Sequence, residues 1–174
     1  GERSDGMIGW SWKERGGGGS VTLFYSINPV TKELLIGLRN EKRANLGGPR
    51  RWCAIGGLVD MGESHRAAQQ RESIEETGID TMAAIELPGL PLISNRLYFI
   101  ANPDKGDGVH AFAFPVAFED LVVANEGYKF TKDPVGLKES GYVRFFPWRE
   151  AAFISCDAIA CASMLRLVAH VLIK

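Results

Sequence analysis

The hydrophobic and polar positions of the N-terminal half first alternate over short runs and then adopt a helical spacing. These patterns predict strands over 20–27, 33–39 and 52–55, and a helix over roughly 64–77. The turn residues 28–31 separate the first two strands, so these two strands are expected to form a hairpin. Gly78 ends the helical pattern and is predicted to be its C-cap.

The C-terminal half continues with strands and then helices. We predict strands over 92–101, 109–119 and 142–146, a long polar loop over 124–141, and helices over 147–152 and 158–173. Ser155 or Asp157 is the expected N-cap of the last helix. In the strand 109–119, alternate positions are phenylalanine or valine and alanine, so both faces suit burial. The expected fold class is therefore α/β, with helices covering both faces of a mixed sheet.

The length of 174 residues suggests one domain that is large enough to bury a sizeable core. We assign residues 20–174 to this domain. The Gly-rich residues 1–19 are expected to form a flexible or peripheral segment, with Trp10 and Trp12 available to contact the fold or a neighbouring subunit. A homodimer would be compatible with this segment.

The charge and cysteine content exclude several classes of partner. The formal net charge is -1, so no global basic field recruits nucleic acid or an anionic membrane. Arg166 and His170 interrupt the most apolar stretch, 158–173, which is also short for a membrane span. The 3 cysteines lack CxxC spacing and predict free thiols in a reducing cytoplasm rather than disulfides or a zinc site.

Three glutamates, Glu72, Glu75 and Glu76, fall within little more than one turn of the predicted helix. Carboxylates at this spacing share one helix face and repel each other, which costs a few tenths of a kcal/mol per pair. A divalent cation among them would reverse the sign of this interaction, and Mg²⁺ prefers such oxygen ligands. The adjacent Arg71 is placed to clamp one carboxylate, and Gly56–Gly57 offers a further backbone carbonyl.

Residues 57–79 resemble the signature of the Nudix hydrolases: Gly, five residues, Glu, seven residues, then Arg-Glu-apolar-x-Glu-Glu-x-Gly-apolar. The matching residues are Gly57, Glu63, Arg71, Glu72, Glu75, Glu76, Gly78 and Ile79. Ser73 departs from the pattern, because the family usually has an apolar residue there, and Ile55 stands where many members have Pro. Neither departure touches a candidate metal ligand.

The resemblance implies an α/β/α sandwich and the hydrolysis of a nucleoside diphosphate linked to another moiety, with Mg²⁺ or Mn²⁺ as cofactor. Carried over residue by residue, it makes Glu72 and Glu76 the direct metal ligands, aided by Glu75 and by the carbonyl of Gly56 or Gly57, with Arg71 beside them. It leaves the general base open between Glu75 and Glu139, with Glu119 and Glu126 after them. Arg39, Arg50 and Arg51 are either part of a solvated loop or contacts to the substrate phosphates, and Trp52 is core, pocket wall or base-stacking residue.

The substrate is less constrained by the sequence. The stretch 52–63, WCAIGGLVDMGE, is similar to a form seen in some ADP-ribose hydrolases, which favours ADP-ribose or a nucleotide sugar. A sanitising pyrophosphatase of nucleoside triphosphates and a non-catalytic nucleotide-binding module remain the alternatives. In each case the expected partner is a small nucleotide.

Overall fold

The computed structural model describes residues 18–41, 50–88, 109–132, 141–155 and 158–173. Several sequence predictions lie outside these residues: the strand 92–101, the candidate base Glu139, and the contacts of Trp10 and Trp12.

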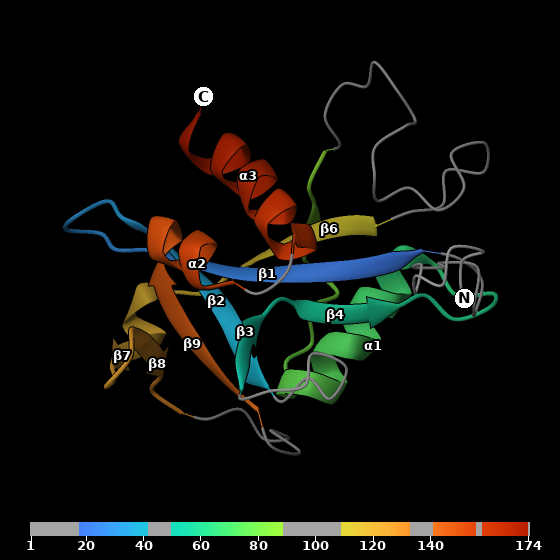
Figure 1. Cartoon of the computed structure of the whole chain (residues 1–174), viewed down its shortest axis with the longest axis horizontal. Coiled ribbons are helices and arrows are strands. Elements are labelled where there is room, and N and C mark those ends of the chain that lie inside the picture. Colours follow the sequence, from blue (N-terminus) through green and yellow to red (C-terminus); the bar gives the residue numbers. More distant parts are fainter. Residues whose placement is uncertain (1–17, 42–49, 89–108, 133–140, 156–157, 174) are drawn as a thin grey trace, which may run out of the picture.

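The described strands form one mixed sheet (Figure 1). The strands are β1 (Gly19–Ile27), β2 (Leu34–Glu41), β3 (Arg51–Cys53), β4 (Ile55–Leu58), β5 (Ile85–Glu86), β6 (Val109–Pro115), β7 (Leu121–Val123), β8 (Tyr128–Phe130) and β9 (Tyr142–Pro147). Their order is β5-β6-β1-β2-β9-β8-β7, with β3 paired to β2 and β4 paired to β1. The β1–β6 pair is parallel and β1–β2 is the predicted antiparallel hairpin. This order puts β1 and β2 at the centre of the sheet.

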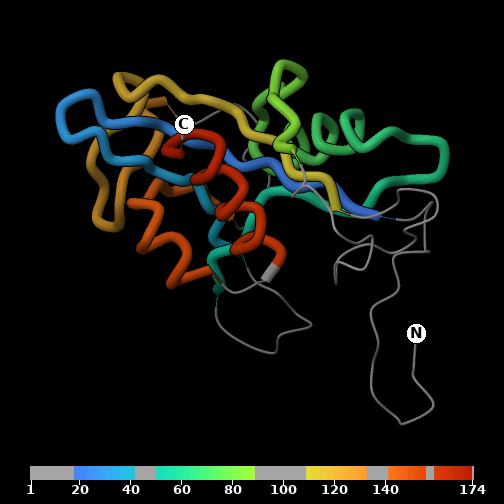
Figure 2. The backbone as a smooth tube through the Cα atoms, turned by 90° about the horizontal axis from the view of Figure 1, so that it is seen from above, coloured from blue at the N-terminus to red at the C-terminus, as the bar shows by residue number. Residues whose placement is uncertain are grey.

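Helices cover both faces of the sheet. They are α1 (His65–Thr77), α2 (Trp148–Ile154) and α3 (Ala158–Leu172). One buried cluster joins α2 and α3 to β1, β2 and β6, and includes Ile36, Leu38 and Met164. A second cluster lies on the other face, where Phe24 and Phe145 pack near Ile79 at the end of α1. Figure 2 shows α1 on one side of the strands and α2 with α3 on the other, so the predicted α/β/α sandwich is confirmed.

The structure corrects some predicted boundaries. The strand predicted over 109–119 ends earlier, since β6 stops at Pro115, where proline cannot donate a hydrogen bond to the sheet. A 3-10 turn at Phe118–Asp120 follows. The predicted loop 124–141 was wrong in part, since β8 lies within it and forms a hairpin with β7. In this hairpin, each strand contributes only three paired residues. Three residues are too few to show a clear alternating pattern in the sequence.

The helix α1, which carries the three glutamates, has a capping residue at each end. The hydroxyl of Ser64 accepts a hydrogen bond from the Ala67 amide, and Gly78 adopts the left-handed conformation at φ 75°. The buried side chain of Gln69 ties the helix to the sheet, because its carbonyl oxygen accepts hydrogen bonds from the hydroxyls of Thr22 and Thr81. These contacts fix the rotation of α1 about its axis and so fix which residues face the sheet.

Ser73, the departure noted in the helix pattern, is fully buried and its hydroxyl has no hydrogen-bond partner in the described structure. A buried unsatisfied hydroxyl costs about 1–3 kcal/mol, and alanine also has the higher helix propensity. We therefore expect Ser73→Ala to raise the free energy of unfolding by roughly 1 kcal/mol. Urea denaturation measures the change, and a variant that is less stable than the wild type would contradict it.

No helix in the described part of the chain is long and apolar enough to cross a membrane. Cys53 is buried and Cys161 is half-buried, and neither forms a disulfide bond within the described residues.

Candidate active site on helix α1

The glycines of β4 bring the main chain into contact with the acidic face of α1. β4 pairs antiparallel with β1, which sets Gly56 opposite Val21 and Gly57 opposite Ser20. A Cβ atom on Gly56 would lie 2.1 Å from the Ser20 carbonyl oxygen, at a φ of +153° that favours glycine. A Cβ atom on Gly57 would lie 2.4 Å from Oε1 of Glu72. Gly56 therefore allows β4 to pack closely on β1, and Gly57 leaves room for the carboxylate of Glu72 against the strand.

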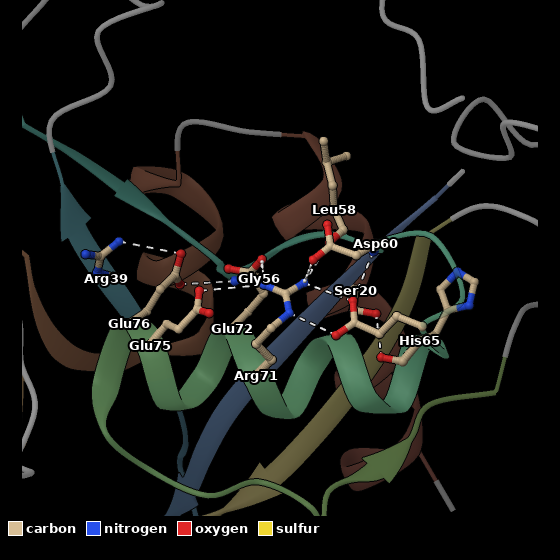
Figure 3. A network of polar contacts seen from close by, with 11 residues as sticks. Ser20, Arg39, Gly56, Leu58, Asp60, His65, Arg71, Glu72, Glu75 and Glu76 are labelled. Carbon is tan, nitrogen blue, oxygen red and sulfur yellow. Dashed lines mark hydrogen bonds and ion pairs between the residues drawn. The ribbon is translucent and has the colours of Figure 1, made fainter. Parts of the chain in front are cut away.

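Arg71 is the centre of the polar network in Figure 3. Its Nε and Nη2 donate to the two carboxylate oxygens of Glu63 at 2.9 and 3.0 Å. Its Nη1 donates to Oε1 of Glu72 at 2.7 Å, and Nη2 also donates to the Leu58 carbonyl at 3.1 Å. A single guanidinium thus connects the loop before α1, the middle of α1 and the end of β4. The carboxylate of Glu63 in turn accepts the Asp60 amide at 3.0 Å, which holds the loop between β4 and α1.

Glu76 lies at the other end of the acidic face, against the backbone of β4 (Figure 3). Its Oε2 accepts a hydrogen bond from the Gly56 amide at 3.2 Å, and its Oε1 lies 3.6 Å from Nη1 of Arg39. Arg39 also pairs with Glu41 on the same strand, so its charge is shared between two carboxylates. The side chain of Glu76 is only 19% exposed and has only part of a positive charge to balance it.

The electrostatics of these groups follow from their burial. Burial raises the pKa of Glu76 to about 8, against the partial compensation from Arg39. Burial likewise raises the pKa of Glu72, although the hydrogen bond from Arg71 works in the opposite direction. In contrast, the hydrogen bond from Arg71 lowers the pKa of Glu63. Glu63 is therefore a structural anion, whereas Glu72 and Glu76 are acidic groups whose charges the protein leaves partly uncompensated.

The donor chemistry of this face fits a hard divalent cation. Within the described ranges of the chain, no three His, Cys, Asp or Glu side chains already converge on one metal-binding point. However, Oε2 of Glu72 and Oε1 of Glu76 accept no hydrogen bond from any described residue. The backbone of β4 lies against both carboxylates, since the Gly56 amide donates to Glu76 at 3.2 Å and a Cβ on Gly57 would lie 2.4 Å from Glu72. Oxygen donors of this kind and the partly uncompensated negative charge are what Mg²⁺ or Mn²⁺ requires.

The other candidate residues lie around this centre. Glu75 is 59% exposed, and its Oε2 is 3.6 Å from Nη1 of Arg71, so it is loosely held at the solvent edge of the cluster. Arg50 donates to the main-chain carbonyl of Asn40 at 3.3 Å, and Arg51 is exposed on β3. Trp52 packs edge-on against Phe146, with ring centroids 4.8 Å apart, so the structure places its ring against the core on the α2 face.

Sequence reasoning missed two contributors to the site. Glu41 shares Arg39 with Glu76, and Asp60 lies 3.6 Å from Arg71. The first was detectable in principle, because residues two apart on a strand point to the same face. The second depends on the path of the loop before α1, and no periodic signal marks that path.

Comparisons with known proteins found a matching family model and solved structures of similar fold. The family model of the NUDIX domain matches residues 20–152. No curated protein sequence matches the chain. Among solved structures, a mutT/nudix family protein from Listeria innocua is similar with a TM-score of 0.53 and 18% identity, covering 91% of this chain and 96% of that one. An Ap4A hydrolase from C. elegans, in a binary complex, gives a TM-score of 0.52 and 14% identity, with 87% and 96% covered. The Nudix hydrolase RenU from M. smegmatis gives 0.52 and 14%, with 94% and 89% covered. At these identities the likeness shows the shared fold.

Proposed function

The chain belongs to the Nudix family, and on this premise we propose that it is a metal-dependent pyrophosphohydrolase acting on a nucleoside diphosphate linked to another moiety. The observation that carries the proposal is the placement of Glu72 and Glu76 against the Gly57 and Gly56 backbone of β4, where burial raises the pKa of both carboxyls. A protein that used this helix only as scaffold would gain stability by replacing Glu76, whose charge only Arg39 partly balances. Mg²⁺ or Mn²⁺ is the proposed cofactor.

Each residue of the site has a distinct proposed role in such a reaction. Glu72 and Glu76, with a main-chain oxygen of Gly56 or Gly57, would hold the cation, and Glu75 would complete its surroundings. When bound, the cation supplies charge neutralisation for the diphosphate and makes an attacking water more acidic. Arg71 fixes Glu72 by donating to Oε1, and it is itself fixed by two hydrogen bonds to Glu63. Phosphoryl transfer depends mainly on such positioning, since the protein has little covalent chemistry to perform.

The cationic side chains on β2 and β3 are the proposed contacts to the substrate phosphates. Arg39 is 9% exposed, and its Nε has no hydrogen-bond partner among the described residues. A phosphate oxygen that reached this buried Nε would supply the hydrogen-bond acceptor that it lacks. Arg50 and Arg51 lie at the start of β3, beyond Arg39 on the neighbouring strand, and would contact the more distant phosphate or sugar.

We propose Glu75 as the general base, because its carboxylate is exposed next to the cluster and accepts no hydrogen bond from a described residue. A general base contributes about 10²–10⁴ to the rate, so Glu75→Gln is expected to lower kcat by at least about 100-fold. Glu139→Gln should lower kcat by less than about tenfold. Steady-state kinetics on the two variants separate the candidates, and the reverse result would assign the role to Glu139.

The substrate proposed first is ADP-ribose or a nucleotide sugar, on the sequence similarity of residues 52–63. The test is a hydrolysis panel with Mg²⁺ and with Mn²⁺ that contains ADP-ribose, nucleotide sugars, coenzyme A and the nucleoside triphosphates. Dinucleoside polyphosphates belong in the panel because the C. elegans Ap4A hydrolase shares the fold. Cleavage of ADP-ribose to AMP and a sugar phosphate is the expected result. Release of pyrophosphate from a nucleoside triphosphate would favour the sanitising enzyme instead.

A nucleotide-binding module without turnover is the remaining alternative. It would show nucleotide binding by calorimetry without hydrolysis of any compound in the panel. The three glutamates argue against it, because a binding module gains nothing from a self-repelling cluster.

A further inference from the structure

A cavity of about 620 Å³ opens between the β7–β8 hairpin and β9. Its volume falls in the range of small-molecule sites. Most of the lining side chains are polar, and two are cationic. The lining residues are Val123, Ala124, Asn125, Glu126, Lys129, Tyr142 and Arg144. None of them belongs to the carboxylate cluster on α1.

The register of the sheet separates this cavity from the candidate active site. Arg39, which faces Glu76, is paired with Val143, and side chains alternate between the two faces along a strand. Tyr142 and Arg144 therefore point to the opposite face, the one covered by α2. α1 packs on β1 and β4, so β2 and β9 lie between it and the hairpin (Figure 1). The two sites are on different faces of the sheet.

The cavity contains a planar cation that is already positioned. The guanidinium of Arg144 lies over the ring of Tyr142, with its central carbon 4.5 Å from the ring centroid. The edge of Trp52 packs on Tyr142, with 5.8 Å between centroids, and supports the ring from behind. Arg144 is anchored by one hydrogen bond to the Val143 carbonyl at 2.8 Å. A guanidinium that lies over one ring can take a second aromatic group on its other face.

The remaining polar groups suit the other parts of one ligand. Neither Arg144 nor Lys129 has a carboxylate partner within ion-pair distance in the described structure, and these two cations outnumber the one carboxylate of the cavity, Glu126, so the cavity favours an anion. Lys129 is exposed on β8 and is suited to a phosphate. Glu126 can accept hydrogen bonds from ribose hydroxyls, as acidic residues do in dinucleotide sites. Asn125 has both donor and acceptor atoms for the edge of a base.

We propose that this cavity is a second binding site, which takes a nucleoside monophosphate with its base stacked on Arg144 and its phosphate at Lys129. The combination of a stacked planar cation, a second cation and a carboxylate matches the base, phosphate and ribose of one molecule better than it matches a bare anion. The site does not depend on the proposed hydrolysis, because a monophosphate has no anhydride bond to cleave.

Calorimetric titration of the whole chain with AMP in EDTA tests the proposal. We expect a Kd of about 0.1–1 mM for AMP. Arg144→Lys keeps the charge but removes the planar stack and should weaken binding about tenfold. Lys129→Gln should weaken it at least about fivefold. Lys132→Gln removes an exposed charge just beyond the cavity, and Glu76→Gln alters the candidate active site, so both should bind AMP within twofold of the wild type.

Inorganic phosphate and adenosine serve as partial ligands, and each is expected to bind at least about tenfold more weakly than AMP. The proposal is overturned if AMP produces no binding signal, or if phosphate alone binds as tightly as AMP. It is equally overturned if Arg144→Lys binds AMP like the wild type, or if Glu76→Gln abolishes the binding. Melting temperatures of the variants within a few degrees of the wild type confirm that a lost signal is not lost folding.

Discussion

Glu76→Gln is expected to lower kcat/KM of the hydrolysis by about 10³-fold or more while leaving the fold intact. On the proposed function, Glu76 would hold the cation, and its loss would remove several kcal/mol of transition-state stabilisation, which corresponds to a factor of this size. The amide oxygen of glutamine can still accept the hydrogen bond from Gly56, and Arg39 keeps its pair with Glu41. Steady-state kinetics on the preferred substrate measures the loss.

The same substitution should change how the stability of the metal-free protein depends on pH. The pKa of Glu76 is about 8 in the folded protein, against an ordinary value of 4.5. The folded state therefore holds a proton more tightly than the unfolded state, and this stabilisation is complete only below about pH 4.5. It is lost as the pH rises through 8, so metal-free wild-type protein should become less stable over this interval. Glu76→Gln should remove the share of this dependence that Glu76 contributes, leaving that of Glu72, and be more stable at pH 8 by on the order of 2–4 kcal/mol.

Glu33→Gln provides the matched control, because it removes an exposed carboxylate just before β2, far from α1 along the sheet. It should alter neither the rate nor the pH dependence. Wild-type activity in Glu76→Gln would contradict the assignment of the metal site. A wild-type slope of stability against pH that survives in the variant would contradict the burial of the charge.

Arg71→Ala is expected to impair both activity and stability. The substitution leaves the carboxylates of Glu63 and Glu72 without their cation and removes the hydrogen bond to the Leu58 carbonyl. Breaking these contacts at a partly buried side chain should lower the free energy of unfolding by roughly 2–3 kcal/mol. Because Glu72 also loses the group that orients it, kcat should fall by at least about 100-fold.

The matched control is Arg66→Ala on the same helix. Arg66 donates to the carbonyls of Met82 and Ala84 at 3.1 and 2.7 Å but contacts none of the carboxylates of the cluster. The Arg66→Ala variant should have a lower free energy of unfolding, but each folded molecule should keep the activity of the wild type. If Arg66→Ala and Arg71→Ala have equal effects on kcat, then Arg71 acts only by stabilising the helix. Arg71→Lys keeps the charge but lacks the planar guanidinium that donates several hydrogen bonds at once. Relative to Arg71→Ala, it should recover part of the stability and little of the rate.

The sequence was sufficient to predict the parts of the fold that local rules determine. The helix bounds near Ser64 and Gly78 follow from capping chemistry, and the β1–β2 hairpin follows from two apolar runs around a turn. The alternation in β6 also held, since Ala111 and Ala113 lie in one cluster and Phe114 packs against the other. Candidate ligands could be placed on one helix face because helical spacing fixes which residues are neighbours.

The sequence could not predict features that depend on contacts between distant segments. The sharing of Arg39 between Glu41 and Glu76 arises only because β2 passes the end of α1. The donation from Arg71 to the Leu58 carbonyl depends on the path of the loop between β4 and α1. The short β7–β8 hairpin, which forms the second cavity, is stabilised by pairing with β9 rather than by its own pattern.

The initial rate of hydrolysis as a function of Mg²⁺ concentration, in the wild type and in Glu76→Gln, tests the central claim most directly. The account predicts no hydrolysis in EDTA and a saturable rise with Mg²⁺ in the wild type. It predicts a rate about 10³-fold lower in the variant at every concentration. Hydrolysis that persists at full rate in EDTA, or a variant that turns over like the wild type, would contradict it.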